Sequence, residues 1–160
     1  MIKHFARSLT PAVLAVACSL ALCGCLYDSP ITAHPTNKAD ERFLGHWTSQ
    51  DGRTKMQVGK YDEYNYVLEY DGQLYHAWES AVAGTPFFSV QSLDSTQDGV
   101  YKFTYSSWKL APDGTLHGRA VNDKIIAGGA KSSAAVQKLL KDNSQNPDLL
   151  GDEIVFVKDK

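Results

Sequence analysis

The stretch YNYVLEYDGQLYHAW, residues 64–78, is the clearest indication of the fold in this chain of 160 residues. In its first half, aromatic and aliphatic side chains recur at every second position, which is typical of a β-strand with one buried face. Asp71-Gly72 follows, a pair that favours a two-residue hairpin turn, and the alternation resumes beyond it. The stretch therefore predicts two antiparallel strands, over residues 64–70 and 74–83.

Similar segments lie on both sides of this hairpin. Between residues 43 and 122 apolar residues recur at a spacing near two, and turn-forming pairs such as Asp51-Gly52 and Asp98-Gly99 separate the segments. Further strands are predicted over residues 44–49, 54–58, 87–93, 100–110 and 115–121.

The period changes in the last part of the chain. Ser132 or Ser133 can cap a helix that runs to about residue 142, with Val136, Leu139 and Leu140 on one apolar stripe. Residues 154–157 are all apolar, which indicates a final strand that is buried on both faces or closes a sheet. We therefore predict a mainly β domain over residues 41–160. It is a single antiparallel barrel or sandwich of seven or eight strands, with one helix before the last strand.

The N-terminus has the composition of an export signal. Lys3 and Arg7 precede an uncharged apolar stretch over residues 9–22. This stretch is shorter than the about 20 residues that a membrane-spanning helix needs. Two alternatives stay open on these residues, namely ordinary signal cleavage after Ala15-Val16-Ala17 and an uncleaved anchor.

The apolar stretch ends in Leu22-Cys23-Gly24-Cys25, which resembles a bacterial lipobox. The resemblance implies a helical signal peptide over residues 1–24, cleavage between Gly24 and Cys25, and fatty acyl chains such as palmitate on Cys25. In bacterial lipoproteins an aspartate directly after the cysteine retains the protein in the inner membrane, and Leu26 holds that place here. The resemblance thus implies an anchored domain on the periplasmic face of the outer membrane of a Gram-negative bacterium.

Residues 25–40 are predicted to be a lipidated, flexible tether. Pro30, Pro35 and the polar run Thr36-Asn37-Lys38 interrupt any period and offer little apolar surface to bury.

Cysteine and charge limit the function of the remaining domain. The three cysteines lie at or before Cys25, so the domain can hold neither a disulfide nor a cysteine-centred metal site. Removal of residues 1–24 takes away Lys3 and Arg7 but no acidic residue, which changes the formal net charge from −2 to −4. A mildly acidic chain without a basic cluster argues against nucleic acid as a partner.

A short motif opens the first predicted strand. Phe43-Leu44-Gly45-His46-Trp47 is similar to the Gly-x-Trp signature of lipocalins and related calycin barrels. The resemblance implies that Gly45 admits the chain tightly and that Trp47 closes one end of the barrel. It extends to small bacterial lipoproteins with a calycin-like domain, a group whose function is largely unknown.

The chain departs from the lipocalin pattern at two points. The second signature, Thr-Asp-Tyr, is absent at a suitable distance. The late arginine that covers the tryptophan is missing from the last strand, so Lys158 or Arg119 would have to replace it. The alternative is that Trp47 is a core aromatic of another β-domain.

Catalytic and metal-binding patterns are not found in the sequence. His46, His76 and His117 belong to no recognisable motif, and His76 and Glu79 lie three apart, which places them on opposite faces of a strand. We therefore predict no catalytic residue, no metal ligand and no cofactor, and an enzymatic role is not favoured.

The aromatic residues of the strands are the candidate binding residues. If their faces point into a barrel, they form an amphipathic cup for one small ligand, and if they point outward, they are cross-strand packing pairs. The residues predicted to line such a pocket are Tyr66, Tyr70, Trp78, Tyr101 and Tyr105.

Three classes of function stay open. The first is a membrane-anchored lipoprotein whose non-enzymatic barrel binds a small amphipathic ligand or is merely packed. The second is an envelope accessory protein that docks on a membrane or cell-wall complex. The third, an unrecognised hydrolase, requires a clustered polar site that the sequence does not show.

Overall fold

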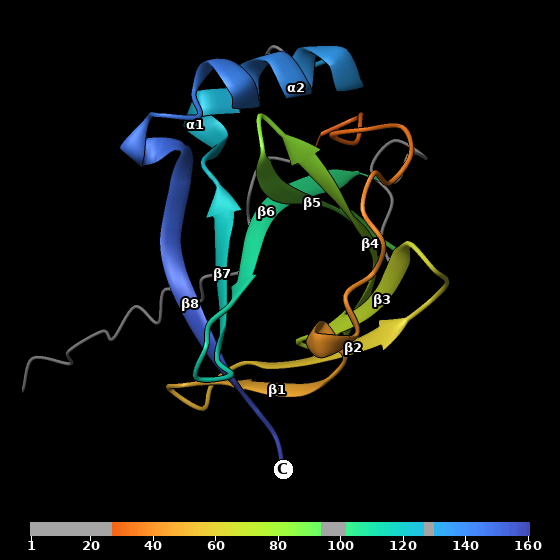
Figure 1. Ribbon diagram of the computed structural model, residues 1–160, viewed down its shortest axis with the longest axis vertical. Coiled ribbons are helices and arrows are strands. Elements are labelled where there is room, and N and C mark those ends of the chain that lie inside the picture. The colour runs from red at the N-terminus through yellow and green to blue at the C-terminus, as the bar shows by residue number, and fades with distance from the viewer. Residues whose placement is uncertain (1–26, 94–101, 127–129) are drawn as a thin grey trace, which may run out of the picture.

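The computed structural model describes residues 27–93, 102–126 and 130–160 (Figure 1). The predicted signal peptide, the cleavage position between Gly24 and Cys25 and the lipid attachment at Cys25 lie outside the described residues, as does Tyr101.

Eight strands of the described chain form one closed antiparallel barrel in which each strand pairs with the next and β1 pairs with β8. The strands are β1 (Gly45–Ser49), β2 (Lys55–Lys60), β3 (Asn65–Tyr70), β4 (Gln73–Val82), β5 (Thr85–Ser92), β6 (Phe103–Leu110), β7 (Leu116–Val121) and β8 (Leu150–Lys158). The prediction of a mainly β fold with one antiparallel barrel is confirmed, and the architecture is consistent with a lipocalin-like fold.

The helical elements lie at the ends of the barrel. Helix α2 (Ser133–Asp142) begins where the sequence predicts, because the Ser132 side chain accepts a hydrogen bond from the Ala135 N–H. Three short elements were not predicted: η1 (Glu41–Phe43), α1 (Asp123–Ile126) and η2 (Pro147–Leu149). In Figure 1, α1 and α2 lie at one end of the barrel and the C-terminus at the other.

Strand β8 is longer than its predicted residues 154–157, because pairing with β7 begins at Leu150. It closes the barrel against β1 through three pairs, Trp47↔Lys158, Thr48↔Val157 and Ser49↔Phe156. It is not buried on both faces, since Val157 is 47% exposed.

The register divides the apolar residues into two cores. Residues directly opposite each other in an antiparallel pair lie on the same face of the sheet. Tyr66 is paired with Ala77, and Ala77 with Val90, and all three side chains belong to the cluster inside the barrel. We call this cluster the inner core, and its buried members are Phe43, Trp47, Met56, Val58, Tyr66, Tyr70, Ala77, Phe88, Val90, Leu116 and Phe156.

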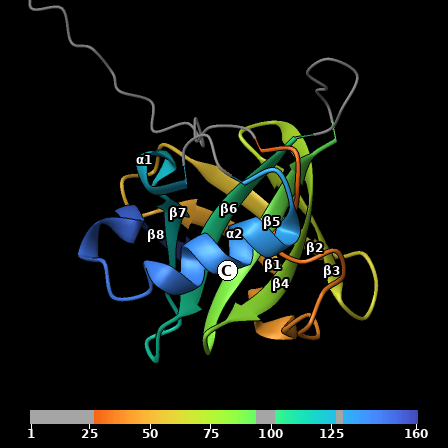
Figure 2. The same cartoon turned by 90° about the horizontal axis from the view of Figure 1, so that it is seen from above.

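The second core lies on the outside of the same wall. Trp78 is paired with Ser89, and Ser89 with Tyr105, so this row faces away from the barrel interior. Helices α1 and α2 and the segment before β1 cover it, and Figure 2 shows α2 lying across β5 and β6. We call it the outer core; its buried members are Ile31, Trp78, Val82, Phe87, Phe103, Tyr105, Val121, Ile126, Val136, Leu140 and Leu149.

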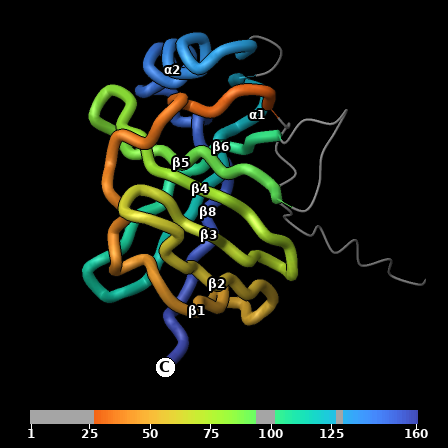
Figure 3. Tube along the Cα trace, turned by 90° about the vertical axis from the view of Figure 1, so that its right-hand side faces the viewer, coloured from red at the N-terminus to blue at the C-terminus, as the bar shows by residue number. Residues whose placement is uncertain are grey.

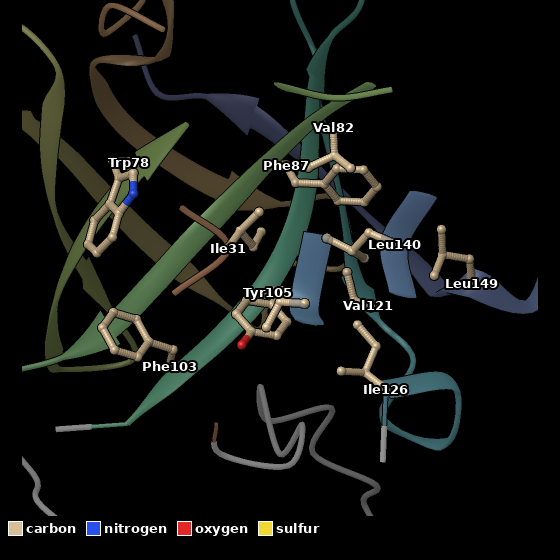
Figure 4. Packing of buried hydrophobic residues seen from close by; sticks show 11 residues of the cluster. Ile31, Trp78, Val82, Phe87, Phe103, Tyr105, Val121, Ile126, Leu140 and Leu149 are labelled. Carbon is tan, nitrogen blue, oxygen red and sulfur yellow. The ribbon is translucent and has the colours of Figure 1, made fainter. Parts of the chain in front are cut away.

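Residues 27–40, which we call the strap, pack against the barrel. Ile31 is fully buried at the centre of the outer core (Figure 4), and its N–H donates to Ser89 Oγ at 3.0 Å. Further along, the Thr36 N–H donates to the Glu79 carbonyl at 3.3 Å. The strap ends just before η1, where the Asp40 N–H donates to Tyr66 Oη at 2.5 Å. Figure 3 shows it starting beside β6 and running across the barrel to β1.

This packing differs from the flexible tether that the sequence predicts over residues 25–40. The strap offers few apolar side chains, and it is instead held by backbone hydrogen bonds to the barrel, by the buried Ile31 side chain and by the stacking of Tyr27 on Tyr105. Every residue has a backbone carbonyl and every residue except proline has a backbone N–H, so composition does not reveal such docking.

Gly118 of β7 is a position where only a hydrogen atom fits. A Cβ placed there would lie 2.4 Å from Trp108 Cζ3. Trp108 cannot easily retreat, because its ring packs against Phe156 and its Nε1 donates to Ser106 Oγ at 2.8 Å. We expect Gly118→Ala to lower the free energy of unfolding by about 2 kcal/mol through overpacking.

Urea denaturation measures this loss, and Gly151→Ala is the matched control. A Cβ at Gly151 would meet its nearest atom, the Ala120 carbonyl oxygen, at 3.6 Å, which is an ordinary contact. Equal destabilisation by the two alanines would contradict the role of the Trp108 contact.

Candidate functional site

The interior of the barrel is filled by its own side chains. The cavity that remains has a volume of about 30 Å³, and its lining includes Phe43, Tyr66 and Trp108. This is about the space of one water molecule, whereas pockets for small organic ligands measure about 300 Å³ or more. Burial raises the pKa of Tyr66 to about 12, so this hydroxyl stays neutral.

The structure does not bring the predicted pocket residues together. Tyr66 and Tyr70 point into the inner core, whereas Trp78 and Tyr105 belong to the outer core. Tyr105 stacks on Tyr27 with ring centroids 4.6 Å apart, and its hydroxyl donates to the Ser29 carbonyl at 2.5 Å. The four predicted pocket residues that the structure describes therefore pack in two separate cores, one inside the barrel and one on its outer face.

The Gly45–Trp47 motif closes the end of the barrel at β1. Trp47 is 1% exposed and donates from Nε1 to the Phe43 carbonyl at 2.8 Å. Lys158 lies over its ring, with Nζ 5.2 Å from the ring centroid. Gly45 has a φ of +126°, and a Cβ there would lie 2.8 Å from Lys158 Cε. A side chain at Gly45 would thus disturb the residue that covers Trp47.

Of the two residues considered as a cover for Trp47, only Lys158 occupies that place. Arg119 instead donates from Nε to the Gly151 carbonyl at 2.8 Å and from its terminal nitrogen to the Leu150 carbonyl at 2.9 Å. These bonds fix the irregular start of β8 against β7.

His117 lies in a chain of polar groups on the outer surface. Its Nδ1 is 3.1 Å from Glu153 Oε2, and its Nε2 is 2.9 Å from Thr115 Oγ1. The order hydroxyl, imidazole, carboxylate is that of a nucleophile with its base. The Thr115 hydroxyl, however, donates to Asp113 Oδ1 at 2.6 Å, and the His117 and Glu153 side chains are 30% and 48% exposed. The group therefore stabilises the turn between β6 and β7.

His76 is half-buried on the outer wall and in contact with Trp78, with ring centroids 5.1 Å apart. Its Nε2 lies 3.0 Å from Asn65 Oδ1. Burial lowers the pKa of His76 below its usual 6.5, against the opposing effects of a hydrogen bond that the imidazole donates to Gln91 and of the charge of Asp62.

The lowered pKa makes stability depend on pH. As the pH falls, the unfolded chain binds a proton at His76 near pH 6.5, before the folded chain does, so stability decreases as the pH falls through this value. We expect His76→Gln to flatten this decrease, as measured by urea unfolding at several pH values. The carboxyl groups whose pKa is lowered, those of Asp40 and Asp62 among them, change the stability only at lower pH, near 4. An unchanged slope in the variant would show that another group is responsible.

A polar groove crosses the outer face of β1, β2 and β3. Cross-strand register aligns His46 with Gln57 and Gln57 with Glu69. The groove has a volume of about 420 Å³, and it exposes both basic and acidic side chains to solvent. Its polar lining residues are His46, Arg53, Lys55, Gln57, Glu69, Asp71 and Asp159. The sequence contained a signal for this groove, namely polar residues at alternating positions of three consecutive strands.

Within residues 27–93, 102–126 and 130–160, no three His, Cys, Asp or Glu side chains are grouped so as to hold a metal ion. None of the helices in the same residues is long and apolar enough to cross a membrane.

Comparisons with protein families, with curated proteins and with solved structures return no match.

Proposed function

We propose that the protein is a membrane-anchored bacterial lipoprotein whose barrel is a docking module for another protein of the cell envelope. The observation that carries the proposal is the filled interior: a cavity of about 30 Å³ leaves little space for a carried ligand. A barrel with a filled interior can engage partners through its outer surface.

The anchor rests on the sequence Leu22-Cys23-Gly24-Cys25. One acyl chain holds a protein weakly at a membrane, and two or more hold it stably. Lipid on Cys25 would place the domain at the periplasmic face of the outer membrane, because Leu26 rather than aspartate follows the cysteine.

The polar groove is the proposed docking surface. It carries both charges, since its lining includes the basic Arg53 and Lys55 and the acidic Glu69, Asp71 and Asp159. Such a mixed surface selects a partner by charge complementarity and register rather than by apolar area. The groove lies on β1 to β3, and its Glu69 is paired with Leu74 of the neighbouring strand β4.

Binding of a small amphipathic ligand is the second candidate. Its support is the apolar cavity beside Tyr66, and it requires that Phe43 and η1 move out of the barrel mouth. Native mass spectrometry of the protein from its own host distinguishes the two candidates, since a retained small molecule favours the second.

The anchor is tested with Cys25→Ser in a host that processes lipoproteins. We expect the wild-type chain to incorporate radioactive palmitate and to shorten to its mature form, and the variant to remain an unlabelled precursor. Cys23→Ser is the matched control, because this cysteine is removed with the signal peptide. Equal maturation without label in all three chains would refute lipidation.

Docking is tested with a photo-crosslinking residue in place of Gln57, which is exposed between His46 and Glu69. We expect one protein adduct in living cells, and its loss when Glu69 and Asp71 are changed to lysine. The same crosslinker at Lys109, exposed on β6, is the control. Identical adducts from both positions would contradict a specific partner of the groove.

A further inference from the structure

We infer that the outer wall around the start of β4 and the end of β5 rests on the lipid bilayer, because Leu26 alone separates Cys25 from the strap. The inference rests on the lipid anchor proposed above and adds an orientation to it. The contacting partner is the bilayer surface, and the contacting residues are Leu74 and Leu93.

The strap fixes the anchored end of the chain at Tyr27. Tyr27 and Phe103 form an isolated antiparallel bridge, with N–H to carbonyl distances of 2.9 and 2.8 Å in the two directions. Next to it, Asp28 forms an ion pair with Lys102, whose side chain is only 15% exposed. The chain therefore becomes part of the barrel wall at Tyr27.

The distance from lipid to wall is consequently short. Tyr27 is the second residue after Cys25, and a fully extended chain spans at most about 7 Å over two residue steps. A free tether over residues 25–40 would allow about 20 Å and any orientation. Because the strap is docked, the domain has neither this reach nor this choice of orientation. The side of the barrel that carries Tyr27 therefore lies at the membrane.

Two exposed leucines lie on this side. Leu93 donates from its N–H to the Leu74 carbonyl at 2.9 Å, and each side chain is 43% exposed. Phe103 is paired with Gln91, two residues before Leu93, and with Tyr27 on its other edge. With strands about 4.8 Å apart, Leu93 lies about 12 Å from Tyr27. Apolar side chains of this size gain free energy when they leave water for the acyl boundary of a bilayer.

Among the residues that the structure describes, the elements that cover the outer core leave this part of the wall open. Ile31 and α2 occupy the wall around Ser89 and Phe87, farther along β5 from its end. Leu74 and Leu93 lie outside the outer core. Tyr61, 72% exposed, lies at the border through its ring contact with His76 at 5.8 Å, and tyrosine is a residue enriched at membrane interfaces.

The test uses the lipidated full-length protein on vesicles of phosphatidylethanolamine and phosphatidylglycerol. Since Cys18 and Cys23 leave with the signal peptide and Cys25 is acylated, an added cysteine is the only thiol of the mature chain. Leu93→Cys and Leu74→Cys receive an environment-sensitive fluorophore. Val157→Cys, 47% exposed on β8, is the matched control.

We expect a blue shift and quenching by nitroxide-labelled lipids at positions 93 and 74, and neither at position 157. Insertion of about twelve Gly and Ser residues after Leu26, a link of about 20 Å, is expected to abolish the difference. If Cys25 carries lipid but position 93 behaves like position 157, or if quenching persists unchanged in the long-link variant, the orientation is refuted and the anchor stands. If the mass of the mature protein shows no lipid, the anchor and the orientation both fall.

Discussion

Trp47→Ala is expected to lower the free energy of unfolding by about 4 kcal/mol. The indole is 1% exposed and closes the barrel at β1, so its removal leaves a void that η1 and β8 cannot fill without moving. The substitution also removes the hydrogen bond to the Phe43 carbonyl and the face on which Lys158 rests. The combined loss is a large fraction of the 5–15 kcal/mol typical of a domain, and is about the largest that one side chain causes.

Urea denaturation of the mature chain measures this effect. His46→Ala is the control, because His46 precedes Trp47 on the same strand with its side chain on the exposed face. We expect the control to change stability by about 0.5 kcal/mol or less. Trp47→Phe, which keeps a ring in the site, should fall between the two. Similar midpoints for all variants would contradict the closing role of the tryptophan.

Ile31→Asp is expected to release the strap and to cost about 3 kcal/mol or more. Ile31 is fully buried between β4, β5 and α2, where a carboxylate would find no cation. The variant can protect the charge only by undocking residues 27–40, which breaks the bonds to Ser89 and from Gln137, whose Nε2 donates to the Ile31 carbonyl at 2.9 Å. Removal of an isoleucine side chain from a core costs about 2–5 kcal/mol by itself.

Limited proteolysis and urea denaturation together separate release from global unfolding. We expect cleavage within residues 27–40 at protease concentrations that leave the wild-type strap intact. Ala33→Asp introduces the same charge two residues later at an exposed position and is the matched control. If it is cleaved as fast as Ile31→Asp, the added charge rather than the lost packing accounts for the change.

The strand pattern of the sequence predicted most of the barrel. Alternation and turn pairs located β1 to β7 within a few residues, because one face of each strand is buried and the other is not. The beginning of β8 was missed since Gly151, Asp152 and Glu153 carry no apolar alternation, although their backbones pair with β7. Pairing of that kind leaves no trace in side-chain composition.

The two cores could not be told apart from the sequence. Tyr66 and Tyr105 lie in equally regular strands, yet one faces the interior and the other the strap and α2. Alternation shows that a strand has a buried face but not which side of the barrel that face meets. The buried Ser80 and Ser89 were a usable signal, because small polar residues at buried positions of an outer face indicate a backbone that approaches closely.

The contacts at the β1 end of the barrel and the polar groove depend on different information. Gly45, Trp47 and Lys158 lie together through a local motif and the last strand. The polar groove depends on the register of three strands, which a list of polar residues does not contain.

The pairing of β1 with β8 places a constraint on biosynthesis. The two strands lie about 110 residues apart in the chain and share only three pairs. β1 therefore leaves the ribosome about 110 residues before β8, and its edge stays unpaired until β8 follows. Such late, non-local closure is slow, and it leaves the nascent chain open to incorrect association in the meantime.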